Sequence, residues 1–213
     1  IAEANMIGIS AGLALSGKIP FPTSFATFLP GRCYDQIRQS VCYSNLNVKL
    51  VATHAGLTVG ADGATHQMME DIAMLRAIPN LKIIVPADSL EAEKATFAIA
   101  NTKGPFYLRL GREPVPIFTS KEEPFEIGKS VTLKEGKDAT IIACGIMVYY
   151  SLLAAETLDR EGISARVIDM HTIKPMDVKT IIAAAKKTGA VVTAEEAQVT
   201  GSLGGAVMEV LGE

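Results

Sequence analysis

A glycine-rich loop between residues 53 and 67 concentrates the side chains best suited to chemistry. Its sequence, T-H-A-G-L-T-V-G-A-D-G-A-T-H-Q, holds two of the chain's three histidines, one aspartate and three glycines. Glycine lets a backbone approach a ligand closely, and histidine exchanges a proton near neutral pH. His54, Asp62 and His66 are therefore candidates for binding hydroxyl groups or moving protons, with an ordinary polar loop as the alternative. No spacing here matches a zinc motif, so we expect no metal site.

Other candidate side chains lie outside this loop. Phe25 and Phe28 are three residues apart beside Arg32, and they form either part of the core or a platform for a flat ligand. Arg112 follows a predicted strand, where its forked guanidinium either binds phosphate or carboxylate or is simply solvated. Glu3 lies in the first turn of an apolar segment, where helix capping is the simplest interpretation. Each of these signals is weak when taken alone.

Alternating strand and helix patterns must position these candidates. We predict strands over 18–26, 48–53, 82–86 and 106–110, and helices over 2–15, 33–43, 66–77 and 89–101. This alternation is typical of a parallel sheet covered by helices on both faces. Ligands of such sheets bind at the carboxyl ends of the strands, so a site is expected among loops 26–34, 53–66 and 111–114.

A second α/β unit is predicted after a segment rich in proline and charge, residues 111–125. Beyond it we predict strands over 139–144, 165–169 and 190–194, and helices over 147–160, 177–187 and after Gly204-Gly205. The fold class is α/β, with two domains that each hold a mostly parallel sheet flanked by helices. The predicted boundaries are 1–115 for the first domain, 116–125 for the linker and 126–213 for the second domain.

Composition excludes several classes of protein. The 213 residues carry 20 basic and 23 acidic side chains, a net charge of −3, so nucleic-acid binding is not expected. The uncharged stretch 139–155 is interpreted as a strand followed by a helix, so we expect no membrane span and no signal peptide. Three cysteines without a CxxC pair favour a reducing, cytoplasmic location. We expect residues to be missing at both ends of the sequence.

Several ordered motifs resemble one family of enzymes. The runs I-A-E-A-N-M-I-G-I-S-A-G, T-F-L-P-G-R-C-Y-D-Q-I-R and T-H-A-G-L-T-V-G-A-D-G-A-T-H-Q are similar to the pyrimidine-binding domain of transketolase. The later runs V-I-D-M-H-T-I-K-P and T-A-E-E-A-Q-V-T-G-S-L-G-G-A-V are similar to its C-terminal domain. The resemblance covers nearly the whole chain. It implies a component that transfers a two-carbon ketol unit between sugar phosphates with thiamine diphosphate as cofactor.

The resemblance implies a role for each candidate side chain. Glu3 matches the glutamate that hydrogen-bonds N1′ of the cofactor's aminopyrimidine and so assists loss of the thiazolium C2 proton. Phe25 and Phe28 match the aromatic positions against which the pyrimidine packs. The loop residues match groups that contact the substrate: His54 and His66 contact the bound sugar and the reaction intermediate, and Asp62 recognises a hydroxyl group. Arg112 matches an arginine that binds the sugar phosphate.

A partner is also implied, because the chain lacks the family's G-D-G…N motif for Mg²⁺ and the diphosphate. We therefore expect a fragment, or one subunit of a split transketolase whose N-terminal section is a separate subunit and holds most of the diphosphate and Mg²⁺. Segments 2–15 and 66–77 are expected to contribute to a subunit interface, which also serves self-association.

Alternatives within the superfamily are deoxyxylulose-phosphate synthase and the β-subunit of a 2-oxo acid dehydrogenase. A non-catalytic assembly subunit is the alternative from another class. His171, Glu195 and Glu196 are polar candidates without an assigned role. The loop 201–205 is interpreted as a close-packing turn, with phosphate binding as its alternative.

Overall fold

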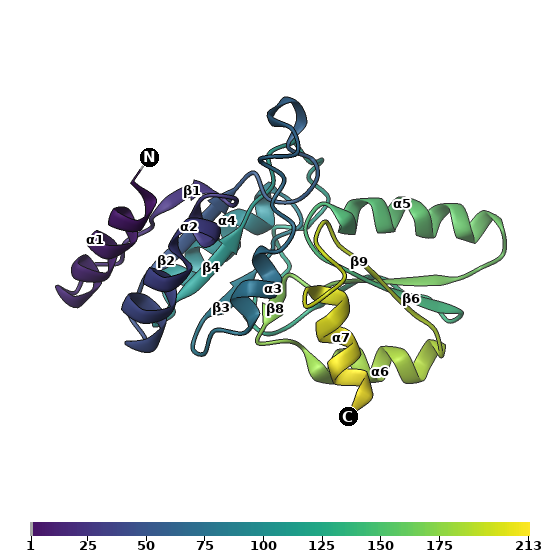
Figure 1. Cartoon of the computed structure of the whole chain (residues 1–213). Helices are drawn as coiled ribbons and strands as arrows, with labels where there is room; N and C mark the ends of the chain where they lie inside the picture. The colour runs from purple at the N-terminus through teal and green to yellow at the C-terminus, as the bar shows by residue number, and fades with distance from the viewer. Residues whose placement is uncertain (1) are drawn as a thin grey trace.

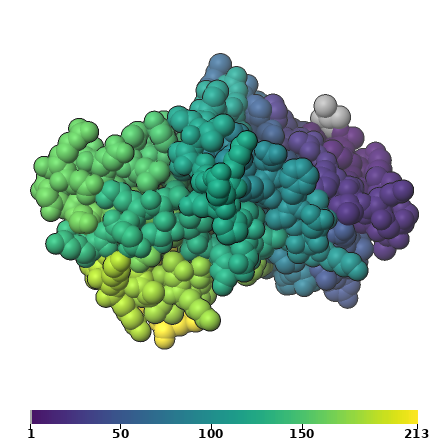
Figure 2. Space-filling view, turned by 180° about the vertical axis from the view of Figure 1, so that it is seen from behind, coloured from purple at the N-terminus to yellow at the C-terminus, as the bar shows by residue number. Residues whose placement is uncertain are grey.

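The computed structural model describes residues 2–213 as two sheets that lie side by side, each flanked by helices (Figure 1). The first sheet has the order β1-β2-β4-β3-β8 and the second has the order β5-β7-β6-β9. This arrangement confirms the predicted α/β class with two mostly parallel sheets. The space-filling view shows an elongated molecule, with the N-terminal segment at one end and the C-terminal half at the other (Figure 2).

The first sheet is parallel over four neighbouring strands, which are β1 (Thr23–Phe25), β2 (Lys49–Thr53), β4 (Phe106–Arg109) and β3 (Lys82–Ile84). Its central strands bury apolar side chains on both faces, as expected for a sheet covered twice. Phe106 and Leu108 pack with Ala95 and Ile99 of α4 (Ser89–Ala100). Tyr107 faces the opposite side, toward the cluster formed with α1 (Glu3–Leu15), α2 (Leu29–Gln36), η1 (Ile37–Tyr43) and α3 (Asp71–Arg76).

The second sheet consists of β5 (Val131–Lys134), β7 (Ala165–Asp169), β6 (Ala139–Ala143) and β9 (Val191–Ala194). Only its edge strand β5 is antiparallel. Helix α5 (Met147–Arg160) covers one face, where Ala155 packs on Ile141 and Val167. Helices α6 (Val178–Thr188) and α7 (Leu203–Gly212) cover the other face (Figure 1).

One strand crosses between the two halves of the chain. β8 (Thr172–Lys174) follows β7 in sequence, yet it pairs antiparallel with β3 in the first sheet. Lys174 Nζ extends this contact, because it donates to the carbonyl oxygens of Arg76 and Ile78 at 2.8 and 2.6 Å. The two sheets are therefore joined by backbone pairing as well as by a shared apolar core.

The structure differs from the predicted elements at several places. The strand predicted over 18–26 is regular only at Thr23–Phe25, and the helix predicted over 33–43 begins earlier and continues as a π-helix after Gln36. The helix predicted over 66–77 was wrong in its first turn, because Met68 forms a parallel bridge with Ala55 and the helix starts at Asp71. Strands β5 and β8 were not predicted at all.

The segment between β4 and β5 contains no helix or strand, but it is held against α4. The Asp88 carboxylate accepts backbone hydrogen bonds from Phe118 at 2.9 Å and from Thr119 at 2.8 Å. Lys94 Nζ donates to the carbonyl oxygen of Glu123 at 2.7 Å. The division of domains at 116–125 stays a prediction. In the described part of the chain, no helix is long and apolar enough to cross a membrane.

Candidate active site

The candidate loop begins where β2 ends, beside the end of β1. Phe25 and Thr53 are register partners in these parallel strands, so the residues that follow them emerge at one edge of the sheet. His54 turns there with a φ of 59° and stacks on Phe25, with ring centroids 3.7 Å apart and an interplanar angle of 20°. Its Nδ1 lies 3.0 Å from the hydroxyl of Thr53.

The two phenylalanines and His66 form one aromatic group. Phe25 and Phe28 lie nearly parallel, with centroids 5.8 Å apart and an interplanar angle of 13°. His66 approaches both rings edge-on, at 6.3 Å from Phe25 and 5.4 Å from Phe28. A turn positions it, because its backbone N–H donates to the carbonyl of Gly63 at 3.0 Å. These rings are only partly buried, as a surface for a flat ligand must be.

Charged groups continue from His54 to the end of β4. Asp62 Oδ2 lies 4.0 Å from His54 Nε2 and 3.6 Å from Arg112 Nε. Arg112 also donates through Nη1 to the carbonyl of Val59 and lies 3.8 Å from Glu113 Oε1. Gly60 has a φ of +61°, which residues other than glycine rarely adopt, and a Cβ there would collide with Arg112 Nη1. Glycine thus suits both the turn and the close approach of the arginine to the loop.

Glu3 completes the group from the other side. It is the first residue of α1 and is 6% exposed, and its Oε2 lies 3.2 Å from Arg32 Nη1. The same guanidinium lies over the ring of Phe28, with 4.2 Å between its Cζ and the ring centroid. A hydrogen bond from its own backbone, with a further contribution from Arg32, holds the pKa of the Glu3 carboxyl below its ordinary value.

The fold therefore brings together every candidate residue that the sequence singled out for the cofactor and the substrate. They form a continuous row that runs from Glu3 through the aromatic group to Asp62 and Arg112. A partly exposed ring surface beside a buried carboxylate fits a flat nitrogen heterocycle such as an aminopyrimidine. Within residues 2–213, no group of three His, Cys, Asp or Glu side chains is placed to hold a metal ion.

A buried ionic network of Asp71, Tyr107 and Arg109 supports the loop, and the sequence did not predict it. Asp71 Oδ2 accepts from the hydroxyl of Tyr107 at 2.7 Å and from Arg109 Nε at 2.8 Å. Burial disfavours the charged guanidinium, but the Asp71 carboxylate raises the pKa of Arg109 above its ordinary value. Arg109 Nη2 then donates to the carbonyls of Met68 and Glu196 at 3.2 and 2.9 Å. The only sequence signal was an arginine within the apolar run F-Y-L-R-L.

The C-terminal half holds the same loop through Glu196. Its carboxylate accepts from the backbone N–H of Thr58 at 3.1 Å and from the Thr58 hydroxyl at 3.2 Å. Gly56 permits this approach, because a Cβ at its φ of +86° would lie 2.8 Å from Glu196 Oε2. Glu196, left without a role by the sequence, thus fixes the loop that carries the candidate residues.

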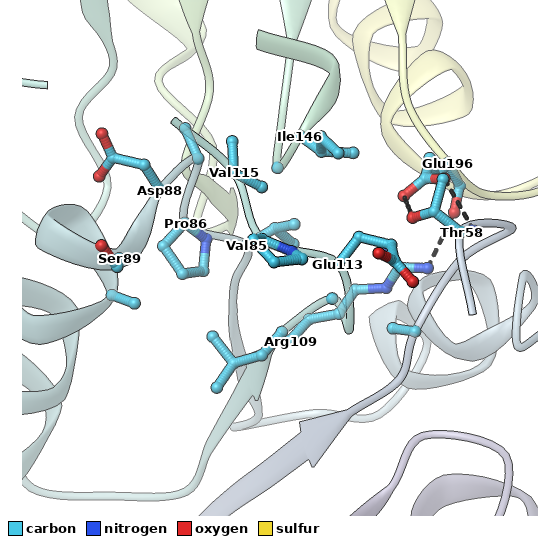
Figure 3. A pocket seen from close by; sticks show the side chains of 17 residues that line it. Thr58, Val85, Pro86, Asp88, Ser89, Arg109, Glu113, Val115, Ile146 and Glu196 are labelled. Atoms are coloured by element: carbon cyan, nitrogen blue, oxygen red, sulfur yellow. Dashed lines mark hydrogen bonds between the residues drawn. The ribbon is translucent and has the colours of Figure 1, made fainter. Parts of the chain in front are cut away.

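A cavity of about 350 Å³ lies between the two halves of the chain (Figure 3). Thr58, Arg109, Glu113 and Glu196 line it on the side of the candidate loop, and Asp88 and Ser89 line it on the side of α4. It therefore adjoins the row of candidate residues through Glu113 and Thr58.

The remaining polar candidates have structural partners. Burial lowers the pKa of His171 to about 4, and its ring lies against Phe125 with centroids 4.2 Å apart. Glu195 accepts backbone hydrogen bonds from Leu203 and Gly204, both at 2.8 Å. Those amides belong to loop 201–205, so a carboxylate of the chain itself bonds to them, as expected for a packing turn rather than a phosphate loop.

Comparison with known proteins decides the family. Residues 1–117 match the family described as "Transketolase, pyrimidine binding domain", and residues 128–213 match "Transketolase, C-terminal domain". The chain belongs to the transketolase family. Its aromatic group and its glutamate thus lie in the pyrimidine-binding part of a transketolase-family chain, as the sequence motifs predicted.

Several relatives of this transketolase chain are similar along its whole length. It is 48% identical to a 6-deoxy-6-sulfo-D-fructose transketolase subunit of a Clostridium strain, over 100% of this chain and 66% of the relative. It is 50% identical to a putative transketolase C-terminal section of Methanocaldococcus jannaschii, over 99% of this chain and 66% of the relative. The chain thus spans about two thirds of the length of these curated relatives.

A solved structure agrees in fold. It is described as "Split gene transketolase, inactive beta4 tetramer" and superposes with a TM-score of 0.94 at 50% identity. The match covers 100% of this chain and 69% of that chain.

Proposed function

We propose that this chain is the pyrimidine-binding and C-terminal component of a transketolase that transfers a two-carbon ketol unit between sugar phosphates. The observation that carries the proposal is the continuous row from Glu3 through Phe25 and Phe28 to Asp62 and Arg112. One end of the row suits a heterocyclic cofactor, and the other end suits a hydroxylated, anionic substrate.

Thiamine diphosphate, when bound, would supply the nucleophilic carbon that ketol transfer requires. The chain's own contribution is to hold the pyrimidine half. Phe25 and Phe28 would pack against the ring, and Glu3 would hold a proton at its N1′ nitrogen. A carboxylate that is only 6% exposed would exchange this proton with the ring more readily than with water, which supports this role.

The other end of the row would bind the sugar. His54 and His66 present imidazoles beside the aromatic group, where they can donate to or accept from hydroxyl groups of the substrate. Asp62, between His54 and Arg112, would orient a hydroxyl group, and the Arg112 guanidinium would bind the terminal phosphate. The carboxylates of Asp62 and Glu113 lie close to Arg112 and would hold its guanidinium beside the loop before a phosphate binds.

A partner chain would supply what this chain lacks, namely the groups that hold the diphosphate and Mg²⁺. Helix α1 lies at the outer edge of the molecule (Figure 1). It leaves apolar side chains open to solvent. Ile9 is 55% exposed, Leu13 is 43% exposed and Leu15 is 75% exposed, which is typical of a surface that a second subunit covers. This supports an N-terminal section as partner, and self-association through the same surface. Three unpaired, buried cysteines support a cytoplasmic location.

The test is ketol transfer from xylulose 5-phosphate to ribose 5-phosphate with thiamine diphosphate and Mg²⁺. The chain is assayed alone and mixed with the N-terminal section encoded in the same organism. Activity only in the mixture is the expected result. No transfer by a complex that binds the cofactor would reject transketolase chemistry, and it would leave a synthase, a dehydrogenase component or an inactive assembly subunit.

A further inference from the structure

One cation stands between the two groups that the proposed function assigns to the pyrimidine. The Arg32 guanidinium lies over the ring of Phe28 at 4.2 Å and places Nη1 at 3.2 Å from Glu3 Oε2. A bound aminopyrimidine would need the same two contacts, because its ring packs on an aromatic face and its nitrogen bonds to the carboxylate. A guanidinium is flat and donates N–H groups at its edge, so it satisfies both groups in the same way.

Phe28 is partly exposed, and three neighbouring groups contact its ring. Phe25 lies parallel to it at 5.8 Å, and His66 meets it edge-on at 5.4 Å. The guanidinium lies over its face, and the carboxylate next to it is 6% exposed. A ring that enters to contact both Phe28 and Glu3 must therefore displace the arginine.

We propose that Arg32 is a placeholder, which occupies the pyrimidine half of the cofactor site and is displaced when thiamine diphosphate binds. This inference rests on the proposed function. The arginine adds a positive charge beside the nearly buried Glu3 carboxylate before the cofactor arrives, which lowers the cost of burying that charge. The cofactor must also compete with the Arg32 side chain for the site, which lowers the apparent affinity of the chain for the cofactor.

The position of Arg32 allows such displacement. Its side chain is 52% exposed, whereas that of Glu3 is 6% exposed, so water can solvate the guanidinium once it leaves the carboxylate. Asp35, exposed and three residues further along α2, offers the released guanidinium another carboxylate. The backbone leaves helical geometry at Cys33, with φ −115° and ψ 17°, so this part of α2 is not a regular helix.

The test is the dissociation constant of thiamine diphosphate, measured by calorimetry on the complex of this chain with its N-terminal section in excess Mg²⁺. Arg32→Met keeps a long apolar side chain and removes the cation. If Arg32 covers the site most of the time, the variant should bind the cofactor about five- to tenfold more tightly than wild type. Loss of a positive charge alone would weaken binding of a diphosphate, so tighter binding has the opposite sign to the charge effect.

Arg38→Gln is the matched control, because it removes an exposed arginine from the adjoining η1 and should not tighten binding. A dissociation constant for Arg32→Met that equals or exceeds the wild-type value would overturn the placeholder role and make Arg32 a bystander or a cofactor ligand. A wild-type complex that binds no thiamine diphosphate would instead overturn the proposed function, and the placeholder role with it.

Discussion

At the scale of single residues, Glu3 is the side chain on which the proposed chemistry depends most. Its carboxyl is nearly buried, and the proposed function requires it to share a proton with the cofactor ring. Glu3→Gln keeps the size but cannot exchange that proton, so turnover by the complex should fall by at least about a hundredfold. Calorimetry should show a much smaller change in cofactor affinity. Comparable losses in both quantities would mean that Glu3 serves binding only.

Arg112 carries the anion-binding part of the proposal. It lies within 4 Å of both Asp62 and Glu113, so its charge is partly compensated while no phosphate is present. Arg112→Ala should raise KM for phosphorylated sugars about tenfold or more, because a charge-assisted, forked contact is lost. KM for the corresponding free sugars should hardly change. An equal rise for both kinds of sugar would remove the phosphate role, and Arg112→Lys should recover only part of the loss.

At the scale of elements, the buried network of Asp71, Tyr107 and Arg109 joins α3, β4 and the loop before α3. Arg109→Met would leave the Asp71 carboxylate buried without its cation. The free energy of unfolding should therefore fall by about 3–5 kcal/mol, measured by urea denaturation. Lys187→Met removes a cation from the exposed pair with Glu135 and should cost far less. Equal losses would show that the network adds nothing beyond an ordinary surface pair.

The same elements show what the sequence could and could not predict. Strands 139–143 and 165–169 were predicted within a residue, because each contains a short run of buried β-branched side chains, Ile141-Ile142 and Val167-Ile168. β8 was missed because it is three residues long and depends on pairing and contacts with residues about ninety positions earlier in the chain. The first turn of the predicted helix at 66–77 was wrong because the bridge between Ala55 and Met68 overrides local propensity.

The residues of the candidate site also divide into those that the sequence indicates and those that only the structure reveals. His54 and Asp62 lie in a glycine-rich loop that the sequence itself points to, whereas Glu3 gained a role only from the family resemblance, because its local pattern favours helix capping. Asp71 and Arg109 carry no such signal, because an ion pair becomes part of a site only when the fold buries both members. Tertiary structure, rather than local pattern, assigns them their role.

At the scale of the whole molecule, the two halves of the chain act as one support for the candidate loop. β8 extends the first sheet, Glu196 holds Thr58, and the backbone N–H of Gln198 donates to the carbonyl of Met69 at 2.8 Å. Three of the residues proposed to bind substrate, His54, Asp62 and His66, thus lie on a loop whose position depends on the C-terminal half, although none of the three belongs to that half.

We expect His171 to make the contact between the two halves of the chain, where β8 joins the first sheet, sensitive to acid. It precedes β8, its backbone carbonyl accepts from the N–H of Val85 at 2.8 Å, and its ring is buried against Phe125. Burial lowers its pKa to about 4 from an ordinary value of 6.5, with the nearby Asp177 carboxylate opposing the shift. The folded protein therefore binds this proton less readily than the unfolded chain does.

The free energy of unfolding therefore does not depend on the His171 proton above pH 6.5. It should fall by about 3 kcal/mol in total as pH falls from 6.5 toward 4, because the unfolded chain takes up this proton first. His171→Gln has no proton to gain, so the difference in unfolding free energy between wild type and variant should change across that window and stay constant above pH 7. Urea denaturation between pH 4 and pH 8 measures this difference. If this difference does not vary with pH, the ring takes up its proton equally in the folded and unfolded states. His171 would then not make the contact between the two halves sensitive to acid.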